Sequence, residues 1–248
     1  MRGVFLFLSC VATSSALKVM TFNTWVSGRE VNDGLTKLAN HIRAVDPDVV
    51  ALQEIEDQYV VPNITTLLGS GWQGAHHCNA SYPDTGIITR HTIIPGSYAQ
   101  VSTGFGVQIQ LDSGKQIVFW SMHLDYLSYG PYAANNKQVT SPDQIMAGEY
   151  PSDYDGRAQN MVELVSSEAF VAQVRNSSSV PVLVAGDFNA PSHLDWIRTN
   201  ARIHGDWEFA WPATLILSTA SGMIDSFRQL YPDPVASPGL SWSTVNKF

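Results

Sequence analysis

Apolar residues along the chain fall into short uninterrupted runs and into one-sided helical stripes. The run from 180 to 185 is bounded by Gly186 and is typical of a buried strand. Further strands are predicted at 18–22, 49–53 and 87–89, and a hairpin is predicted from 105–111 and 116–122 around the turn at 112–115. Apolar positions on one helical face predict helices over 35–45, with Asn32 or Asp33 as the cap, and over 158–172.

Residues 127–156, between the hairpin and the second helix, follow neither pattern. They are rich in Tyr, Pro, Ser, Asn and Gly and show little periodicity, so we expect a long surface loop. Loops of this length in compact domains are usually functional. After His123, Tyr126, Tyr129 and Tyr132 either line a substrate cleft or pack over the core.

The order of these elements predicts one domain preceded by a signal peptide. The chain has 248 residues and shows no internal repeat, charge block or linker. Residues 1–16 combine one positive charge, a short apolar core and small residues before Ala16, as secretory signals do. We therefore expect cleavage after Ala16, a mature domain over 17–248, no membrane span, and a secreted, extracellular or lumenal protein.

Composition supports export and weighs mildly against a nucleic-acid partner. Three acceptor sequons for N-glycosylation begin at Asn63, Asn79 and Asn176. Cys78 would be the single cysteine of the mature chain, so no internal disulfide is expected. Without Arg2, 13 basic residues face 22 acidic ones, a net charge of −9 that repels a polyanion. A bound divalent cation would reverse that sign locally.

Polar side chains follow four of the predicted strands. These residues are Asn23, Glu54, His123 and the pair Asp187 and Asn189. Their convergence at one sheet edge would suit hydrolysis of a phosphate ester. Mg²⁺ takes oxygen ligands and keeps several waters, so Glu54 with an Asn and the substrate phosphate would suffice to bind it. Asp187 would orient or deprotonate water, Asn189 would hold Asp187 or the phosphate, and a protonated His123 would donate to a phosphoryl oxygen.

Five motifs in order resemble the endonuclease/exonuclease/phosphatase superfamily, which has the deoxyribonuclease I-like fold. They are Thr21-Phe22-Asn23-Thr24-Trp25, Leu52-Gln53-Glu54, Gly86-Ile87-Ile88-Thr89-Arg90, Ser121-Met122-His123-Leu124 and Gly186-Asp187-Phe188-Asn189. The resemblance covers about 19–243. It implies an α/β (α+β) fold, a four-layer β-sandwich of two packed mixed sheets flanked by helices. It also implies Mg²⁺-dependent cleavage of a phosphoester, with Mn²⁺ as the alternative ion.

Carried over residue by residue, the resemblance assigns Asn23 and Glu54 to the metal, His123 to the phosphate, and Asp187 with Asn189 to the Asp-x-Asn pair. Asp225 and Arg228 match a further segment of the family, which we interpret as structural, bracing a loop.

The family's closing Ser-Asp-His signature has no match here, and the 248 residues contain no Asp-His dipeptide. We therefore expect the last strands to be missing, a sheet edge to be exposed, and the chain to be inactive or nearly so.

Several neighbouring polar residues have simpler interpretations than a role in the site. His76 and His77 beside Cys78 are better explained as a polar loop than as a metal cluster, because no fourth ligand stands at a recognisable spacing. Ser192 or Asp195, next to His193, would cap a short helix.

Two functions compete. The first is a secreted Mg²⁺-dependent phosphoesterase, impaired in this form, acting on a lipid, nucleotide or nucleic-acid ester. The second is a secreted non-catalytic relative that binds through the same fold. The acidic balance and the tyrosine-rich loop favour substrates other than DNA.

Overall fold

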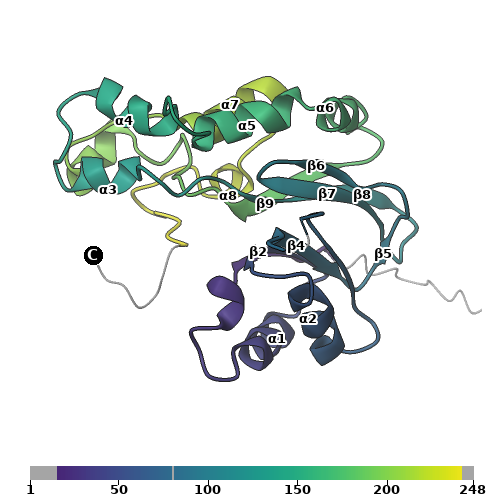
Figure 1. Ribbon diagram of the computed structural model, residues 1–248. Coiled ribbons are helices and arrows are strands. Elements are labelled where there is room, and N and C mark those ends of the chain that lie inside the picture. The colour runs from purple at the N-terminus through teal and green to yellow at the C-terminus, as the bar shows by residue number, and fades with distance from the viewer. Residues whose placement is uncertain (1–15, 80, 242–248) are drawn as a thin grey trace, which may run out of the picture.

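The fold consists of two facing sheets with helices on their outer sides (Figure 1). It is known from a computed structural model, which describes residues 16–79 and 81–241. The signal peptide predicted at 1–16 therefore lies outside the described residues except for Ala16, as do residues 242–248. Among the helices within the described ranges, none is both long and apolar enough to cross a bilayer.

The first sheet has four strands in the order β1-β2-β4-β3. Its strands are β1 (Val19–Asn23), β2 (Val49–Ile55), β3 (Gln73–His76) and β4 (Asp84–Thr89). β1 runs parallel to β2, while β4 runs antiparallel to both β2 and β3. The outer face of this sheet is covered by α1 (Gly34–Val45) and α2 (Val60–Leu68), and the 3-10 turn η1 (Val26–Gly28) follows β1 (Figure 1).

The second sheet has five strands, with the main order β5-β7-β8-β9 and β6 paired to β7. Its strands are β5 (Thr92–Ile93), β6 (Ala99–Val101), β7 (Gly104–Gln110), β8 (Gln116–His123) and β9 (Val182–Asp187). β9 is parallel to β8 and the other pairs are antiparallel, so both sheets are mixed. This sheet is covered by α5 (Arg157–Ser166), α6 (Glu168–Arg175) and α7 (Pro212–Ser221) (Figure 1).

Alternation along the strands builds three apolar layers. In β2, Val49 and Ala51 face the other sheet, whereas Val50 and Leu52 pack under α1 and α2. In β8, Phe119 lies between the sheets, while Trp120 packs beneath α5 and α6. The helix, sheet, sheet, helix arrangement predicted from the motifs is confirmed.

The remaining elements lie beyond one end of the sheets. They are α3 (Gly130–Asn135), α4 (Pro142–Glu149), η2 (Arg198–His204) and α8 (Ser226–Leu230). The prediction of an irregular loop over 127–156 is therefore wrong, because the segment contains two short helices. Ser141 and Gln144 form a capping box at the start of α4, a local signal that helical periodicity does not register.

Two other predicted elements need correction. The helix predicted over 158–172 is broken at Ser167, which adopts an extended backbone and caps α6 by accepting the Phe170 N–H. The strand predicted to be buried, β9, is only partly buried along its whole length. Within the described residues it pairs only with β8, so it forms one border of its sheet.

Candidate active site

Glu54 is aimed into the site by a β-bulge. The pairing of β2 with β4 shifts register between Gln53 and Ile55, and the extra residue, Glu54, has φ of +60°. Because of the bulge, Glu54 has no partner residue in β4, and its carbonyl is not part of the hydrogen-bond pattern between the two strands. Hydroxyls of Thr24 and Ser27 donate to that carbonyl at 3.1 Å each and so satisfy it.

A left-handed turn after β1 completes the support of Glu54. Trp25, Val26 and Ser27 all have positive φ, at 48°, 55° and 57°. Such a backbone costs roughly 1–2 kcal/mol per non-glycine residue. The turn brings the Val26 N–H to Glu54 Oε2 at 2.6 Å, so the strained backbone helps to fix the carboxylate.

Asn23 links the two sheets at the centre of the site. Its Nδ2 donates to Glu54 Oε1 at 2.9 Å and to Asp187 Oδ2 at 3.0 Å. Its Oδ1 accepts the Trp25 N–H at 2.9 Å. The reverse orientation of the amide would place an oxygen against two carboxylates, so the charges determine which way Asn23 faces.

The tetrapeptide at 186–189 places Asp187 at the end of β9, opposite His123 in the parallel pairing. Gly186 is required there, because a Cβ atom would stand 2.0 Å from the Met122 carbonyl oxygen. Asn189 then holds Asp187 in place: its N–H donates to Asp187 Oδ1 at 3.0 Å, and its Nδ2 donates to the Leu124 carbonyl at 2.9 Å.

His123 is oriented by Asp84, a residue that the sequence analysis missed. The Nδ1 atom of His123 lies 2.9 and 3.0 Å from the two Asp84 carboxylate oxygens. Burial alone would lower the pKa of His123, but the hydrogen bond and charge of Asp84, together with Asp187 and Glu54, raise it. Asp84 stands at the start of β4, two residues before Gly86, yet only the packing of β4 against β8 of the other sheet shows that it reaches this site.

The site carries an excess of negative charge. Among the described residues, neither Glu54 nor Asp187 has an ion-pair partner, whereas Asp84 pairs with His123. Burial and the nearby carboxylates of Asp84 and Glu56 raise the pKa of the Tyr82 hydroxyl. The site therefore favours a positively charged ligand.

The oxygen atoms present suit a hard divalent cation that retains water. No group of three or more His, Cys, Asp or Glu side chains within the described ranges is close enough to enclose a metal. A cation of the Mg²⁺ type does not need such a cage, because one or two carboxylates, waters and substrate oxygens complete its shell. The Glu54 carboxylate matches that requirement. The Asn23 Oδ1 atom accepts the Trp25 N–H and has a second lone pair for a cation.

The structure brings together all five residues predicted for the site, namely Asn23, Glu54, His123, Asp187 and Asn189. It also supports the structural interpretation of Asp225 and Arg228. Asp225 caps α8 by accepting the Arg228 N–H, but the carboxylate that Arg228 binds is Asp195, at 2.7 Å. Since Asp195 pairs with Arg228 and accepts the Ser192 N–H, it does not cap the short helix, which begins later, at Arg198.

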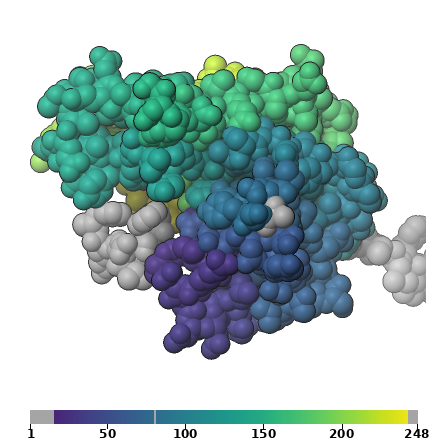
Figure 2. Space-filling view, viewed as in Figure 1, coloured from purple at the N-terminus to yellow at the C-terminus, as the bar shows by residue number. Residues whose placement is uncertain are grey.

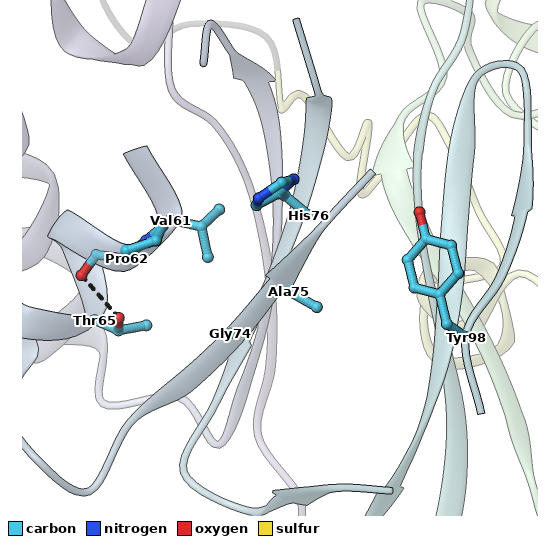
Figure 3. A pocket seen from close by; sticks show the side chains of 7 residues that line it. All are labelled: Val61, Pro62, Thr65, Gly74, Ala75, His76 and Tyr98. Atoms are coloured by element: carbon cyan, nitrogen blue, oxygen red, sulfur yellow. Dashed lines mark hydrogen bonds between the residues drawn. The ribbon is translucent and has the colours of Figure 1, made fainter. Parts of the chain in front are cut away.

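His76 and His77 do not form a metal site among the described residues. His76 Nδ1 lies 2.7 Å from the His77 carbonyl, and His77 Nε2 lies 3.0 Å from the Val101 carbonyl. His76 belongs to β3 rather than to a loop, and it lines a cavity of about 460 Å³ beside α2 and Tyr98, where it faces Val61 (Figure 3). That cavity lies on the border strand of the first sheet and shares no residue with the site around Asn23.

Comparison with known proteins agrees with this geometry. A family model described as the Endonuclease/Exonuclease/phosphatase family matches residues 20–246. An uncharacterized protein of Caenorhabditis elegans is 48% identical over 237 residues, an alignment that covers 96% of this chain and 73% of the relative.

Among solved structures, a 3′ phosphatase from Neisseria called NExo, bound to a product DNA hairpin, is similar with a TM-score of 0.52 at 16% identity, covering 88% of this chain and 76% of that one. The AP endonuclease LMAP from Leishmania major has a TM-score of 0.48 at 17% identity, with coverage of 87% and 70%. At 16% identity the NExo structure bears on the fold alone. Because the family model spans nearly the whole chain, the protein belongs to the Endonuclease/Exonuclease/phosphatase family.

Proposed function

We propose that this protein is a secreted phosphoesterase that depends on Mg²⁺, with Mn²⁺ able to replace it. The observation that carries the proposal is the hydrogen-bonded set of Asn23, Glu54 and Asp187, which joins both sheets beside the pair of His123 and Asp84. Burying a carboxylate without a cationic partner lowers the stability of the fold, and a bound cation removes that penalty. A phosphate ester would bring further negative charge, which makes a cation more necessary still.

Each residue of the site has a distinct task in this proposal. Glu54 would hold the cation and Asn23 would contribute its Oδ1 atom, and the cation would supply positive charge to the phosphoryl oxygens when bound. Asp187, fixed by the Asn189 N–H, orients the attacking water and accepts its proton. His123, whose pKa is raised by Asp84 against the effect of burial, donates a hydrogen bond from Nε2 to a phosphoryl oxygen when it is protonated.

We further propose that turnover by the chain itself is slow. Within residues 16–79 and 81–241, His123 is the only histidine that the hydrogen-bond network connects to the site. One imidazole can neutralise only part of the charge that develops on the phosphoryl oxygens.

The proposed test compares hydrolysis of methyl 4-nitrophenyl phosphate by the purified chain in Mg²⁺, Mn²⁺ and a metal-free buffer with chelator. Glu54→Gln should abolish the metal-dependent rate, while Glu168→Gln, a matched change of an exposed glutamate on α6, should leave it unchanged. Equal rates in Glu54→Gln and the unaltered chain would refute the site. Absence of hydrolysis under every condition would favour a non-catalytic binding role.

Export of the protein is a separate part of the proposal. It is supported by the signal-like segment at 1–16 and by Asn63, Asn79 and Asn176, which are all exposed and can therefore carry glycans. Expression in a eukaryotic secretory host should yield medium-borne protein that begins at Leu17 and loses mass on deglycosylation. Retention of residues 1–16 in an intracellular, unglycosylated product would contradict export.

A further inference from the structure

The space between the two sheets is apolar along most of its length and becomes polar in the layer directly beneath the site. The inward positions of β2 and β8 are first occupied by buried apolar side chains, namely Val49, Ala51, Ile117 and Phe119. Because strand side chains alternate, the next inward positions are Gln53 and Ser121, and both are fully buried. Glu54 directly follows Gln53, and His123 comes two residues after Ser121.

The Gln53 side chain joins the two sheets in this layer. Its Nε2 donates to Ser121 Oγ at 3.3 Å, and its Oε1 accepts the Thr21 hydroxyl at 3.2 Å. The Ser121 hydroxyl in turn donates to the Leu52 carbonyl at 3.2 Å. These hydrogen bonds therefore connect β1, β2 and β8, the strands that carry three of the site residues.

The groups available determine the direction of these hydrogen bonds. Ser121 uses its only hydroxyl proton on the Leu52 carbonyl, so its Oγ atom accepts from Gln53. The Gln53 amide must then face Ser121 with its nitrogen and Thr21 with its oxygen. Gln53 thus has one amide orientation that satisfies both neighbours.

The site is divided between the two sheets that Gln53 joins. Asn23, Glu54 and Asp84 belong to the first sheet, whereas His123 and Asp187 belong to the second. In the space-filling view, the N-terminal part with the first sheet is the lower, purple side of the molecule, and the teal and green part lies above it (Figure 2). The Asn23 Nδ2 atom crosses this division to reach Asp187 at 3.0 Å, a distance that a shift of about 1 Å would turn into a broken hydrogen bond.

We propose that Gln53 is a positioning residue, whose hydrogen bond to Ser121 sets the spacing of the sheets beneath the site and so the placement of Glu54 relative to His123. The inference rests on the proposed function for the roles of Glu54 and His123, whereas the spacing itself does not depend on that function. Apolar contact is non-directional and permits several spacings, but a hydrogen bond restricts both distance and angle.

Thr85 provides a matched control in the same layer. It lies opposite Gln53 in the pairing of β2 with β4 and is buried. Its Oγ1 atom has no hydrogen-bond partner among the described residues. Thr85→Val keeps the shape of the side chain and removes only that hydroxyl, so it should alter neither the kinetics nor the titration of His123.

The first measurement is the rate of hydrolysis of methyl 4-nitrophenyl phosphate in Mg²⁺. Gln53→Met fills a similar volume without the hydrogen bonds and should lower kcat about tenfold while changing KM less, because misplaced groups affect the transition state more than binding. Ser121→Ala should act in the same direction. The double variant should lose no more than the larger single loss, since both changes remove the same hydrogen bond.

The second measurement needs no catalysis. Burial lowers the pKa of His123, but Asp84, Asp187 and Glu54 together raise it above its ordinary value. Because Asp84 and Glu54 lie on the opposite sheet, Gln53→Met should lower this pKa in an NMR titration of the histidine ring protons. The His123 signal is assigned by its loss in His123→Asn. A purely structural role of Gln53 would lower the midpoint of urea unfolding and leave the pKa of His123 unchanged.

The two measurements separate the inference from the proposed function. If the unaltered chain hydrolyses the ester, and Gln53→Met matches Thr85→Val in kcat and in the pKa of His123, the positioning role is wrong and the function stands. If the unaltered chain does not hydrolyse the ester but Gln53→Met lowers the pKa of His123, the function is wrong and the spacing role stands. Circular dichroism establishes that each variant is folded, and Ser121→Ala, the smaller change, decides the question if Gln53→Met does not fold.

Discussion

At the residue scale, the behaviour of His123 depends on Asp84. Asp84→Asn keeps the shape of the side chain but removes the negative charge that raises the pKa of His123. His123 should then lose its proton at lower pH, so the falling limb of the rate profile moves towards acid. We expect about a tenfold lower rate at pH 8, the size of one charge-assisted hydrogen bond, and a smaller loss at pH 6.

A second histidine–aspartate pair provides the control for this experiment. His91 Nδ1 lies 3.1 Å from Asp112 Oδ1 on the opposite end of the second sheet. Asp112→Asn should leave the rate profile of hydrolysis unchanged. A similar shift in both variants would mean that the profile reports general charge rather than His123.

The pair of His123 and Asp84 also makes a pH-dependent contribution to the free energy of unfolding. The folded-state pKa of His123 is raised, so its stabilising effect is complete below about pH 6.5, the ordinary histidine value, and is lost as pH rises through the folded-state value. Asp84→Asn should therefore lower the free energy of unfolding by on the order of 1–2 kcal/mol at pH 5.5 and by less at pH 9. Urea titrations at the two pH values measure the difference, and a gap that grows with pH would contradict the assignment.

At the element scale, the approach of β9 to β8 depends on Gly186. A methyl group there would meet the Met122 carbonyl oxygen at 2.0 Å, so the strands must separate. Gly186→Ala should cost roughly 1–3 kcal/mol of stability, the range for overpacking, and should displace Asp187 from His123. Gly71→Ala, which has no atom within 4 Å of the new methyl, is the matched control in denaturant unfolding. Equal midpoints for the two variants would show that β9 adapts freely.

Arg157 and Glu149 determine how the segment that carries α3 and α4 is attached to α5. Both side chains are fully buried, and burial raises the pKa of Glu149 even though Arg157 opposes that change. Arg157→Met leaves a buried carboxylate without its partner and should cost about 3–5 kcal/mol. Adding Glu149→Leu should recover part of that loss in urea unfolding, because the fully buried carboxylate is then removed as well. A double variant no more stable than Arg157→Met would show that the main-chain hydrogen bonds of Arg157, rather than the ion pair, account for the cost.

Periodicity in the sequence identified the elements that carry the site but not all the contacts they make. The apolar runs that precede Asn23, Glu54, His123 and Asp187 correctly predicted strands. In β2 and β8 the run is continuous because both faces of the strand are buried, whereas β1 and β9 are only partly buried. Asp84 left no such record, since it follows Pro83 with a positive φ of 58° and reaches His123 only because the two sheets face each other.

Helices were predicted less completely than strands. α2 begins with Val60-Val61-Pro62, and its proline lies in the first turn, where the missing N–H is harmless but the sequence suggests a break. α3 and α4 have six and eight residues, too few for a clear apolar stripe, and they are stabilised by packing on distant residues such as Trp211. Only the tertiary structure contains that information.

At the scale of the whole molecule, the net charge of −8 means that any cation screens repulsion and adds some stability. Binding of Mg²⁺ at a specific site on Glu54 should add to this effect. When the Mg²⁺ concentration is a hundredfold above the dissociation constant, binding stabilises the folded state by about 2.7 kcal/mol. For a chain of this size, that corresponds to a rise in melting temperature of roughly 5–10 °C. NaCl at equal ionic strength reproduces the screening alone. Glu54→Gln should retain the NaCl response and lose the additional Mg²⁺ response, whereas Glu168→Gln should retain both. Differential scanning fluorimetry measures the melting temperature of each protein with each salt, and an undiminished Mg²⁺ response in Glu54→Gln would place the cation elsewhere on the acidic surface.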